Sequence, residues 1–219
     1  MPGAPGLRQA CSRPSSRSVA RVACSSMSTY SRTYSPALAQ LYYAPPPSDL
    51  LAQLRAAPRQ APDQGGFLEA SWQALVACAA EMGDDAVRAE YDALFGGVGK
   101  PDIYLFASHY LTGFLNEKPL VGLRDDLAAL GLRRDAAMSE TEDHIAYLCE
   151  VMRYLIAGDD VAVANLTQQR QFHARHLRPW VADLCDAIAA HPAARFYGAL
   201  AEFTRAFFSV EAQAFDMMA

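Results

Sequence analysis

The stretch Asp84-Asp85-Ala86-Val87-Arg88-Ala89-Glu90-Tyr91-Asp92-Ala93-Leu94-Phe95 decides the fold class, because its apolar residues follow the period of an α-helix. Val87, Tyr91, Leu94 and Phe95 fall at spacings of three and four residues, which places them on one helical face. Glycines at positions 96 and 97 end the pattern. The sequence therefore predicts a helix over 84–95 with one apolar stripe.

Helical periodicity continues on both sides of this stretch, and no segment alternates with period two as a strand would. The expected helices cover 38–43, 49–57, 67–82, 102–115, 118–130, 139–157, 159–176, 179–190 and 193–215. No repeat of about 33–47 residues is present, which argues against a helical solenoid. We therefore predict an all-α fold, a single compact bundle of roughly eight to ten helices.

The N-terminal residues differ in composition from the rest of the chain. Residues 1–26 are rich in Ser, Pro and Arg and have no apolar core, so a secretory signal is not expected. Either this stretch is an organellar transit peptide, or Met27 is the true start of the protein. In both cases we expect a disordered extension over residues 1–35 and a helical domain over residues 36–219.

Charge is distributed unevenly along the chain. All 24 acidic residues lie after residue 48, whereas five of the 19 basic residues precede it, so the body is more acidic than the total charge of −5 indicates. An acidic body repels nucleic acid and favours cationic partners such as Arg-rich peptides.

The five cysteines form no C-x-x-C pair, and their number is odd. Cys78, Cys149 and Cys185 fall in apolar helical segments, where cysteine acts as a small hydrophobic residue. We therefore expect a reduced, cytoplasmic environment with neither a disulfide framework nor a zinc ribbon. No apolar run approaches the ~20 residues that span a bilayer, so stable membrane insertion is not expected.

Two short strings stand out, about fifty residues apart. The first string is Tyr91-Asp92-Ala93-Leu94-Phe95 at the end of the helix predicted over 84–95. Its aromatic and apolar residues form either an ordinary buried stripe or, with the glycine loop that follows, the border of a groove for an apolar helical peptide. The pattern alone leaves both interpretations open.

The second string is Glu140-Thr141-Glu142-Asp143-His144. Ser139 and Glu142 match a capping box, which predicts that a helix begins at Ser139. Adjacent helical residues point about 100° apart, so Asp143 and His144 are not expected to form a catalytic dyad with each other. Glu140 and His144 are spaced to pair, and carboxylates at this helix start are suited to receive an Arg side chain.

Other patterns give little support for catalysis. His173 and His176 form H-x-x-H, but nothing near them in sequence completes a metal site, so satisfied or surface histidines are the simpler interpretation. The chain lacks a P-loop, a G-x-G-x-x-G fingerprint and a G-x-S-x-G elbow. We therefore predict no cofactor and no metal.

Together the two strings resemble the signature motifs of the TorD/DmsD family of redox-enzyme maturation chaperones. Tyr91, Leu94 and Phe95 match an aromatic residue followed, after two variable positions, by Leu-Phe. Glu140, Asp143 and His144 match the second family motif, in which Thr141 stands where the family has proline. Weaker echoes follow in family order, namely Leu41-Tyr42-Tyr43, Pro119-Leu120, His176-Leu177, Pro179-Trp180 and Phe196-Tyr197, and the resemblance covers about residues 36–212.

The resemblance implies an all-helical cytoplasmic chaperone that is not an enzyme. Such proteins bind the twin-arginine signal peptide of an apo-molybdoenzyme and hold the enzyme for cofactor insertion before export. The implied peptide-binding residues are Tyr91, Leu94 and Phe95 as groove wall or its support, Glu140, Asp143 and His144 as the polar end, and Trp72, Tyr104 and Tyr110 along the same cleft. A monomer or a helix-exchanged homodimer fits this class of protein.

Two other functions stay open at the level of sequence. One is an assembly adaptor for a membrane-bound respiratory oxidoreductase complex. The other is a small helical metal-dependent hydrolase that would use His144, His173, His176 and a carboxylate.

Overall fold

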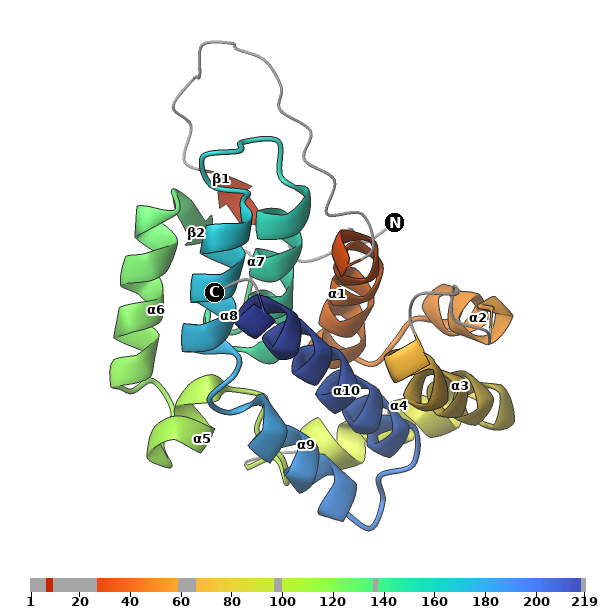
Figure 1. Ribbon diagram of the computed structural model, residues 1–219. Coiled ribbons are helices and arrows are strands. Elements are labelled where there is room, and N and C mark those ends of the chain that lie inside the picture. Colours follow the sequence, from red (N-terminus) through yellow and green to blue (C-terminus); the bar gives the residue numbers. More distant parts are fainter. Residues whose placement is uncertain (1–6, 10–26, 59–65, 97–99, 136–137, 218–219) are drawn as a thin grey trace.

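The computed structural model describes residues 7–9, 27–58, 66–96, 100–135 and 138–217. This part of the chain contains ten helices and two three-residue strands (Figure 1). The helices are α1 (Met27–Tyr43), α2 (Ser48–Ala56), α3 (Gly66–Glu81), α4 (Asp84–Phe95), α5 (Ala107–Thr112), α6 (Lys118–Ala129), α7 (Ile145–Ala157), α8 (Leu166–His176), α9 (Val181–Ala190) and α10 (Phe196–Met217). The predicted all-α bundle is confirmed.

Helix α7 lies at the centre of the bundle because almost every side of it is apolar. Ten of its 13 residues are buried, which is typical of a helix that is surrounded by other elements. Helix α1 packs along α7, while α10 packs against α3 and α9 (Figure 1). Helices α5 and α6 lie at one side of the bundle, opposite α2 and α3 (Figure 1). None of the helices described is long and apolar enough to cross a membrane.

Several helix boundaries agree with the sequence predictions. Two differ, because the residues at these boundaries form hydrogen bonds or ion pairs with distant parts of the chain. Helices α4 and α6 begin where expected. The helix predicted over 102–115 is reduced to α5, because residues 103–106 are not helical and form hydrogen bonds with distant parts of the chain. The helix predicted from Ser139 begins only at Ile145, so the capping-box prediction is wrong. Its glutamate forms ion pairs instead, as described below.

The two strands were not expected from the sequence. β1 (Leu7–Gln9) pairs antiparallel with β2 (Leu132–Arg134). Helix α1 begins at Met27, inside the segment that we expected to be a disordered extension, while residues 1–6 and 10–26 of that segment lie outside the described residues. A single bridge between Phe106 and His144 adds a further strand-like contact. The pairing residues are few, so the fold class does not change.

Candidate functional site

The first string forms part of an aromatic cluster between α1, α4 and α10. The ring centroid of Phe95 lies 5.0 Å from that of Tyr197 and 5.2 Å from that of Tyr91, both edge to face. Tyr42 completes the cluster at 6.4 Å from Phe95. The Tyr91 hydroxyl donates to the Tyr42 carbonyl oxygen at 3.3 Å. The string therefore fixes the end of α4 to the end of α1.

Leu94, the central residue of the first string, is fully buried and cannot contact a ligand from this position. Its carbonyl oxygen accepts a hydrogen bond of 2.9 Å from the amide of Ile103. The chain thereby turns back after α4 and continues through residues 104–106 to the start of α5 at Ala107. This segment carries the connection to the second string.

The backbone of residues 105–107 forms hydrogen bonds with the end of the second string and the first residue of α7, about forty positions further along the chain. The amide of Ile145 donates to the Leu105 carbonyl at 2.9 Å, and the amide of Ala107 donates to the Asp143 carbonyl at 3.0 Å. The two strings therefore meet at a junction, where one short segment joins them by backbone hydrogen bonds.

Asp143 is buried and caps α5 from a distance in sequence. Its Oδ2 accepts from the Ser108 amide at 3.0 Å and from the Ser108 hydroxyl at 2.6 Å. Its Oδ1 accepts from the Thr141 hydroxyl at 2.6 Å. Thr141 thus makes a hydrogen bond that proline, which has no hydroxyl, would not make at the same position. With both oxygens occupied, Asp143 holds the second string in place and does not present a free carboxylate.

His144 is the N-cap of α7 and is buried. Its Nδ1 accepts from the Ala146 amide at 3.1 Å, and its ring meets Phe106 at 5.0 Å and Tyr43 at 6.3 Å. Burial lowers the pKa of His144 to about 4, so the ring is neutral at physiological pH. His144 therefore acts as a cap and a packing surface, and it does not pair with Glu140.

Glu142 belongs to an ion-pair cluster in place of the expected capping box. Its Oε2 accepts from Arg124 Nε at 3.0 Å and Nη2 at 2.8 Å, and its Oε1 lies 3.6 Å from Arg134 Nε. The two guanidinium groups come from α6 and β2. Glu142 thus ties the second string to these elements and is not available to an incoming cation.

The residues that remain accessible around the junction form a surface that we call the motif face. It consists of the half-buried side chains of Tyr43, Tyr91, Phe95, Phe106 and Glu140 and the exposed side chain of Asp92. Burial raises the pKa of Tyr91, and the nearby carboxylates of Glu140 and Asp92 raise it further. These two carboxylates therefore lie close enough to Tyr91 to act on it electrostatically, although they come from different strings.

Neither carboxylate of the motif face has a cationic partner within the ranges that the structure describes. The Glu140 carboxylate accepts from the Ser139 hydroxyl at 3.1 Å, whereas Arg134 Nη1 donates to the Glu140 backbone carbonyl at 3.3 Å. No Lys or Arg among the described residues pairs with Asp92. Among the residues implied by the sequence, the structure brings Tyr91, Phe95 and Glu140 together at this face. Leu94, Asp143 and His144 support it from below.

Trp72, Tyr104 and Tyr110 do not join the motif face through any described contact. Trp72 packs on Phe203 of α10 at 5.3 Å and donates to the Pro58 carbonyl at 2.9 Å. Tyr104 stacks on His109 at 4.3 Å. Tyr110 stacks on Trp180 at 5.5 Å, and burial raises its pKa. That these three residues line the same cleft stays a prediction.

Tyr43, Asp92 and Phe106 belong to the motif face but were not singled out as site residues from the sequence. Asp92 lies inside the first string at a variable position, and Tyr43 lies in a weaker family echo. Phe106 had no signal of its own, because only the bridge to His144 places it at this surface.

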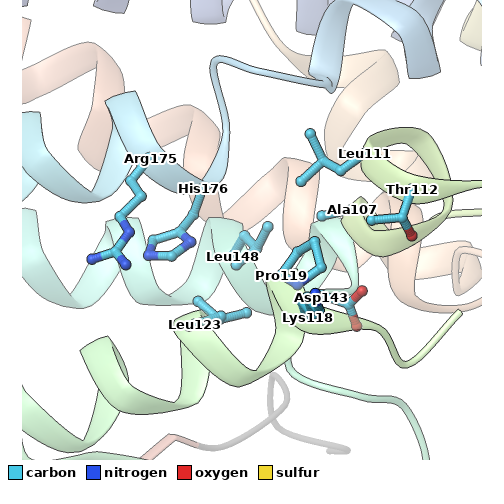
Figure 2. A pocket seen from close by; sticks show the side chains of 11 residues that line it. Ala107, Leu111, Thr112, Lys118, Pro119, Leu123, Asp143, Leu148, Arg175 and His176 are labelled. Atoms are coloured by element: carbon cyan, nitrogen blue, oxygen red, sulfur yellow. The ribbon is translucent and has the colours of Figure 1, made fainter.

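A pocket of 330 Å³ lies on the other side of the junction, between α5, α6, α7 and α8 (Figure 2). Ala107 and Asp143 line it, whereas the rings of the adjacent Phe106 and His144 pack on each other at 5.0 Å and do not line it. Asp143 is the one residue of the two strings among its lining. The pocket therefore does not connect the two strings into a single groove.

The two histidines of the H-x-x-H pattern face different neighbours. Nε2 of His176 lies 2.6 Å from Asp126 Oδ2, whereas the ring of His173 is buried between Phe208 and Phe215. His144 lies at the start of α7 and caps it. The three histidines of the hydrolase hypothesis therefore make separate, local interactions.

The buried histidines predict an acid-labile fold. Burial lowers the pKa values of His144 and His173 to about 4 each, whereas histidine in an unfolded chain has a pKa of about 6.5. Between these values the unfolded chain binds more protons, so the free energy of unfolding should fall as the pH drops from about 6.5 to about 4. His144→Asn keeps a cap acceptor and removes one titrating group, so its urea-derived stability should vary less with pH in this window. An unchanged pH dependence would contradict the burial of a neutral ring.

Comparison with known proteins gives three consistent similarities. The family model of the nitrate reductase delta subunit matches residues 64–186, which include both strings. Chaperone protein TorD of Shewanella loihica is 29% identical over 143 residues, which cover 62% of this chain and 67% of that protein. The crystal structure of an Archaeoglobus fulgidus protein described as a redox enzyme maturation protein has a TM-score of 0.51 at 17% identity, covering 89% of this chain and 98% of that one. At this identity the structural likeness supports the fold alone.

Proposed function

The chain belongs to the nitrate reductase delta subunit family, which includes the TorD/DmsD redox-enzyme maturation chaperones, and we propose that it binds the twin-arginine signal peptide of an apo-molybdoenzyme at the motif face. In this role it holds the enzyme in the cytoplasm for cofactor insertion before export, without catalysing a reaction.

One observation carries the proposal: the carboxylates of Asp92 and Glu140 both lie close enough to Tyr91 to raise the pKa of its hydroxyl, and neither has a described cationic partner. A guanidinium group forms charge-assisted hydrogen bonds with carboxylates and stacks on aromatic rings. A surface that combines free carboxylates with half-buried aromatic rings therefore suits an arginine pair better than a lysine pair. The acidic body of the chain favours the approach of a cationic leader.

The buried residues of the two strings do not contact the peptide in this proposal, but they hold in place the helices that form the motif face. Leu94, Asp143 and His144 make contacts that fix α4, α5 and α7 relative to one another. They thereby support the segments that carry the motif face. A preorganised site loses less conformational entropy when a flexible peptide binds.

The assembly of a membrane-bound respiratory complex is a second candidate, because the matching family model is described as a nitrate reductase delta subunit. The two functions differ in the partner protein that the chain would bind. An exported precursor with an Arg-Arg leader in a native pull-down favours the first, whereas a catalytic subunit without a leader favours the second.

The proposed function is tested by titrating a synthetic twin-arginine leader peptide into the purified chain by calorimetry. The double variant Asp92→Asn/Glu140→Gln should weaken binding by about 10–100-fold, because each charge-assisted hydrogen bond contributes about 1.5–3 kcal/mol when formed and part of that is retained by neutral acceptors. A leader with Lys-Lys in place of Arg-Arg should bind more weakly to the native chain. High salt should weaken binding as well.

The control is Asp159→Asn, which removes an exposed carboxylate from the loop between α7 and α8. Its affinity for the leader should equal that of the native chain. If the double variant folds normally and binds as tightly as the control, the motif face is not the site.

A further inference from the structure

One guanidinium group holds the short segment that carries Glu140, the residue that the second string contributes to the motif face. Arg134 Nη1 donates to the backbone carbonyls of Met138 and Glu140, the latter at 3.3 Å. Arg134 Nε lies 3.6 Å from Glu142 Oε1. Hydrogen bonds from a charged donor are stronger than those between neutral groups. A single side chain therefore holds this segment before, at and after Glu140.

Arg134 is itself anchored outside the second string. It is the last residue of β2, and in the pairing with β1 it lies opposite Leu7. Leu132, at the other end of β2, is buried in the core. The guanidinium group therefore extends from backbone that is fixed independently of the motif face. Its side chain is 32% exposed, so its ion pair should contribute little to the stability of the bundle.

Glu140 has few other contacts that fix its position. Its carboxylate accepts from the hydroxyl of Ser139, which is the adjacent residue and is itself exposed. Among the described residues, no contact other than that of Arg134 holds the Glu140 backbone. Asp92, the other carboxylate near Tyr91, differs because it lies within the regular backbone of α4. The placement of Glu140 relative to Asp92 therefore depends on Arg134.

Arg124 of α6 provides a matched comparison within the same ion-pair cluster. Its Nε and Nη2 both donate to Glu142 Oε2, at 3.0 and 2.8 Å, so it contacts Glu142 more closely than Arg134 does. Within the described part of the chain, Arg124 makes no contact with Glu140. The two arginines carry the same charge and share one partner, and they differ in whether they hold the Glu140 backbone.

We propose that Arg134 is a positioning residue of the motif face, which holds Glu140 so that its carboxylate and that of Asp92 receive the arginine pair of the leader together. This inference rests on the proposed function, because it concerns the same site. It implies that a positive residue of the chain favours the binding of a positive peptide. Long-range electrostatics alone gives the opposite sign, because loss of a positive charge strengthens the attraction of an acidic body for a cationic leader.

The test compares Arg134→Met with Arg124→Met by calorimetric titration of the synthetic twin-arginine leader into the full chain. Both substitutions keep an apolar stem and remove one positive charge, so their long-range effects should be similar. Arg134→Met should weaken binding about 5–10-fold, within the range of coupling between interacting residues. Arg124→Met should bind as tightly as the native chain or slightly more tightly. Equal affinities for the two variants, or tighter binding by Arg134→Met, would overturn the proposal.

A double-mutant cycle identifies the carboxylate on which Arg134 acts. In a Glu140→Gln background, Arg134→Met should have little further effect on leader affinity, because the carboxylate that it positions is already absent. In an Asp92→Asn background, Arg134→Met should still weaken binding by about the same factor as in the native chain. A general loss of structure would lower the affinity equally in both backgrounds, and that result would contradict a positioning role.

Hydrogen exchange of the peptide-free chain measures positioning without the leader. The amides of residues 138–142 should exchange faster in Arg134→Met than in Arg124→Met, while those of α7 stay equally protected. Equal exchange of residues 138–142 in the two variants would overturn the proposal, whatever the leader does. If the native chain binds the leader and Arg134→Met binds it equally well, this inference fails alone. If the native chain binds no leader, the proposed function fails and this inference fails with it.

Discussion

Replacing Glu90 by alanine should lower the free energy of unfolding by about 3–5 kcal/mol, because several amides lose a charged acceptor and each buried donor left unsatisfied costs about 1–3 kcal/mol. Glu90 of α4 is buried, and its carboxylate caps the first turn of α10. Oε1 accepts from the amides of Arg195 at 2.8 Å and Tyr197 at 2.7 Å, and Oε2 accepts from the amide of Phe196 at 3.0 Å. Without the carboxylate, three amides at a helix N-terminus lose their partner. Urea denaturation measures the loss.

The matched control for Glu90 is Glu81→Ala. Glu81 pairs with the Arg195 side chain at 2.8 Å at the same end of α10, but both side chains are more than half exposed. An exposed ion pair contributes about 0–1 kcal/mol, so this variant should remain close to the native stability. Equal losses for the two variants would show that the buried cap has no special role.

The Glu90 cap also bears on the motif face. Tyr197, whose amide it holds, packs on Phe95 at 5.0 Å and on Tyr91 at 5.7 Å. The residue that precedes the first string therefore positions the ring against which the string packs. Glu90→Ala should reduce leader binding in proportion to the loss of folded chain.

Replacing Asp143 by alanine should cost about 2–4 kcal/mol, because the buried Ser108 amide and hydroxyl and the Thr141 hydroxyl all lose their acceptor. The start of α5 then loses its cap, and the pairing of residues 105–107 with the second string weakens. Leader affinity should fall as a consequence of this loosening. Thermal unfolding and calorimetric titration of the same sample measure both effects.

Ser108→Ala distinguishes support from direct contact at this position. This variant removes the hydroxyl donor of the hydrogen bond at 2.6 Å and leaves the Asp143 carboxylate in place. If Asp143 acts as a support, Ser108→Ala should reduce stability and leader affinity together, although less than Asp143→Ala does. If Asp143→Ala keeps full stability and loses binding while Ser108→Ala binds normally, Asp143 contacts the peptide itself.

Sequence periodicity was sufficient where a helix is stabilised mainly by its own apolar stripe. Helix α4 spans the predicted residues, because Val87 and Leu94 are buried at helical spacing. Helix α6 begins at Lys118, as expected, with Leu120, Leu123 and Leu127 buried. The family resemblance predicted from the two strings agrees with the matching family model.

Periodicity failed where long-range partners replaced local ones. Ser139 and Glu142 have the spacing of a capping box, yet Glu142 pairs with Arg124, eighteen residues earlier in the chain. The helix expected after Pro101 does not include Ile103, whose amide donates to the Leu94 carbonyl instead. A local pattern holds no information about such partners.

The candidate site was predicted in its composition but not in its shape. Tyr91, Phe95 and Glu140 reach the same surface, whereas Leu94, Asp143 and His144 are buried beneath it. A motif residue that supports a surface and one that forms it give the same sequence signal. Only the hydrogen bonds of Asp143 and His144 separate the two roles.

The most direct measurement is photo-crosslinking with a synthetic leader that carries benzoylphenylalanine immediately after its arginine pair. Mass spectrometry of the digested complex locates the crosslinked residues. Binding at the motif face should give crosslinks to the half-buried rings of Tyr43, Tyr91, Phe95 or Phe106. Crosslinks confined to α3, α5 or α6, with none at these four rings, would contradict the central claim.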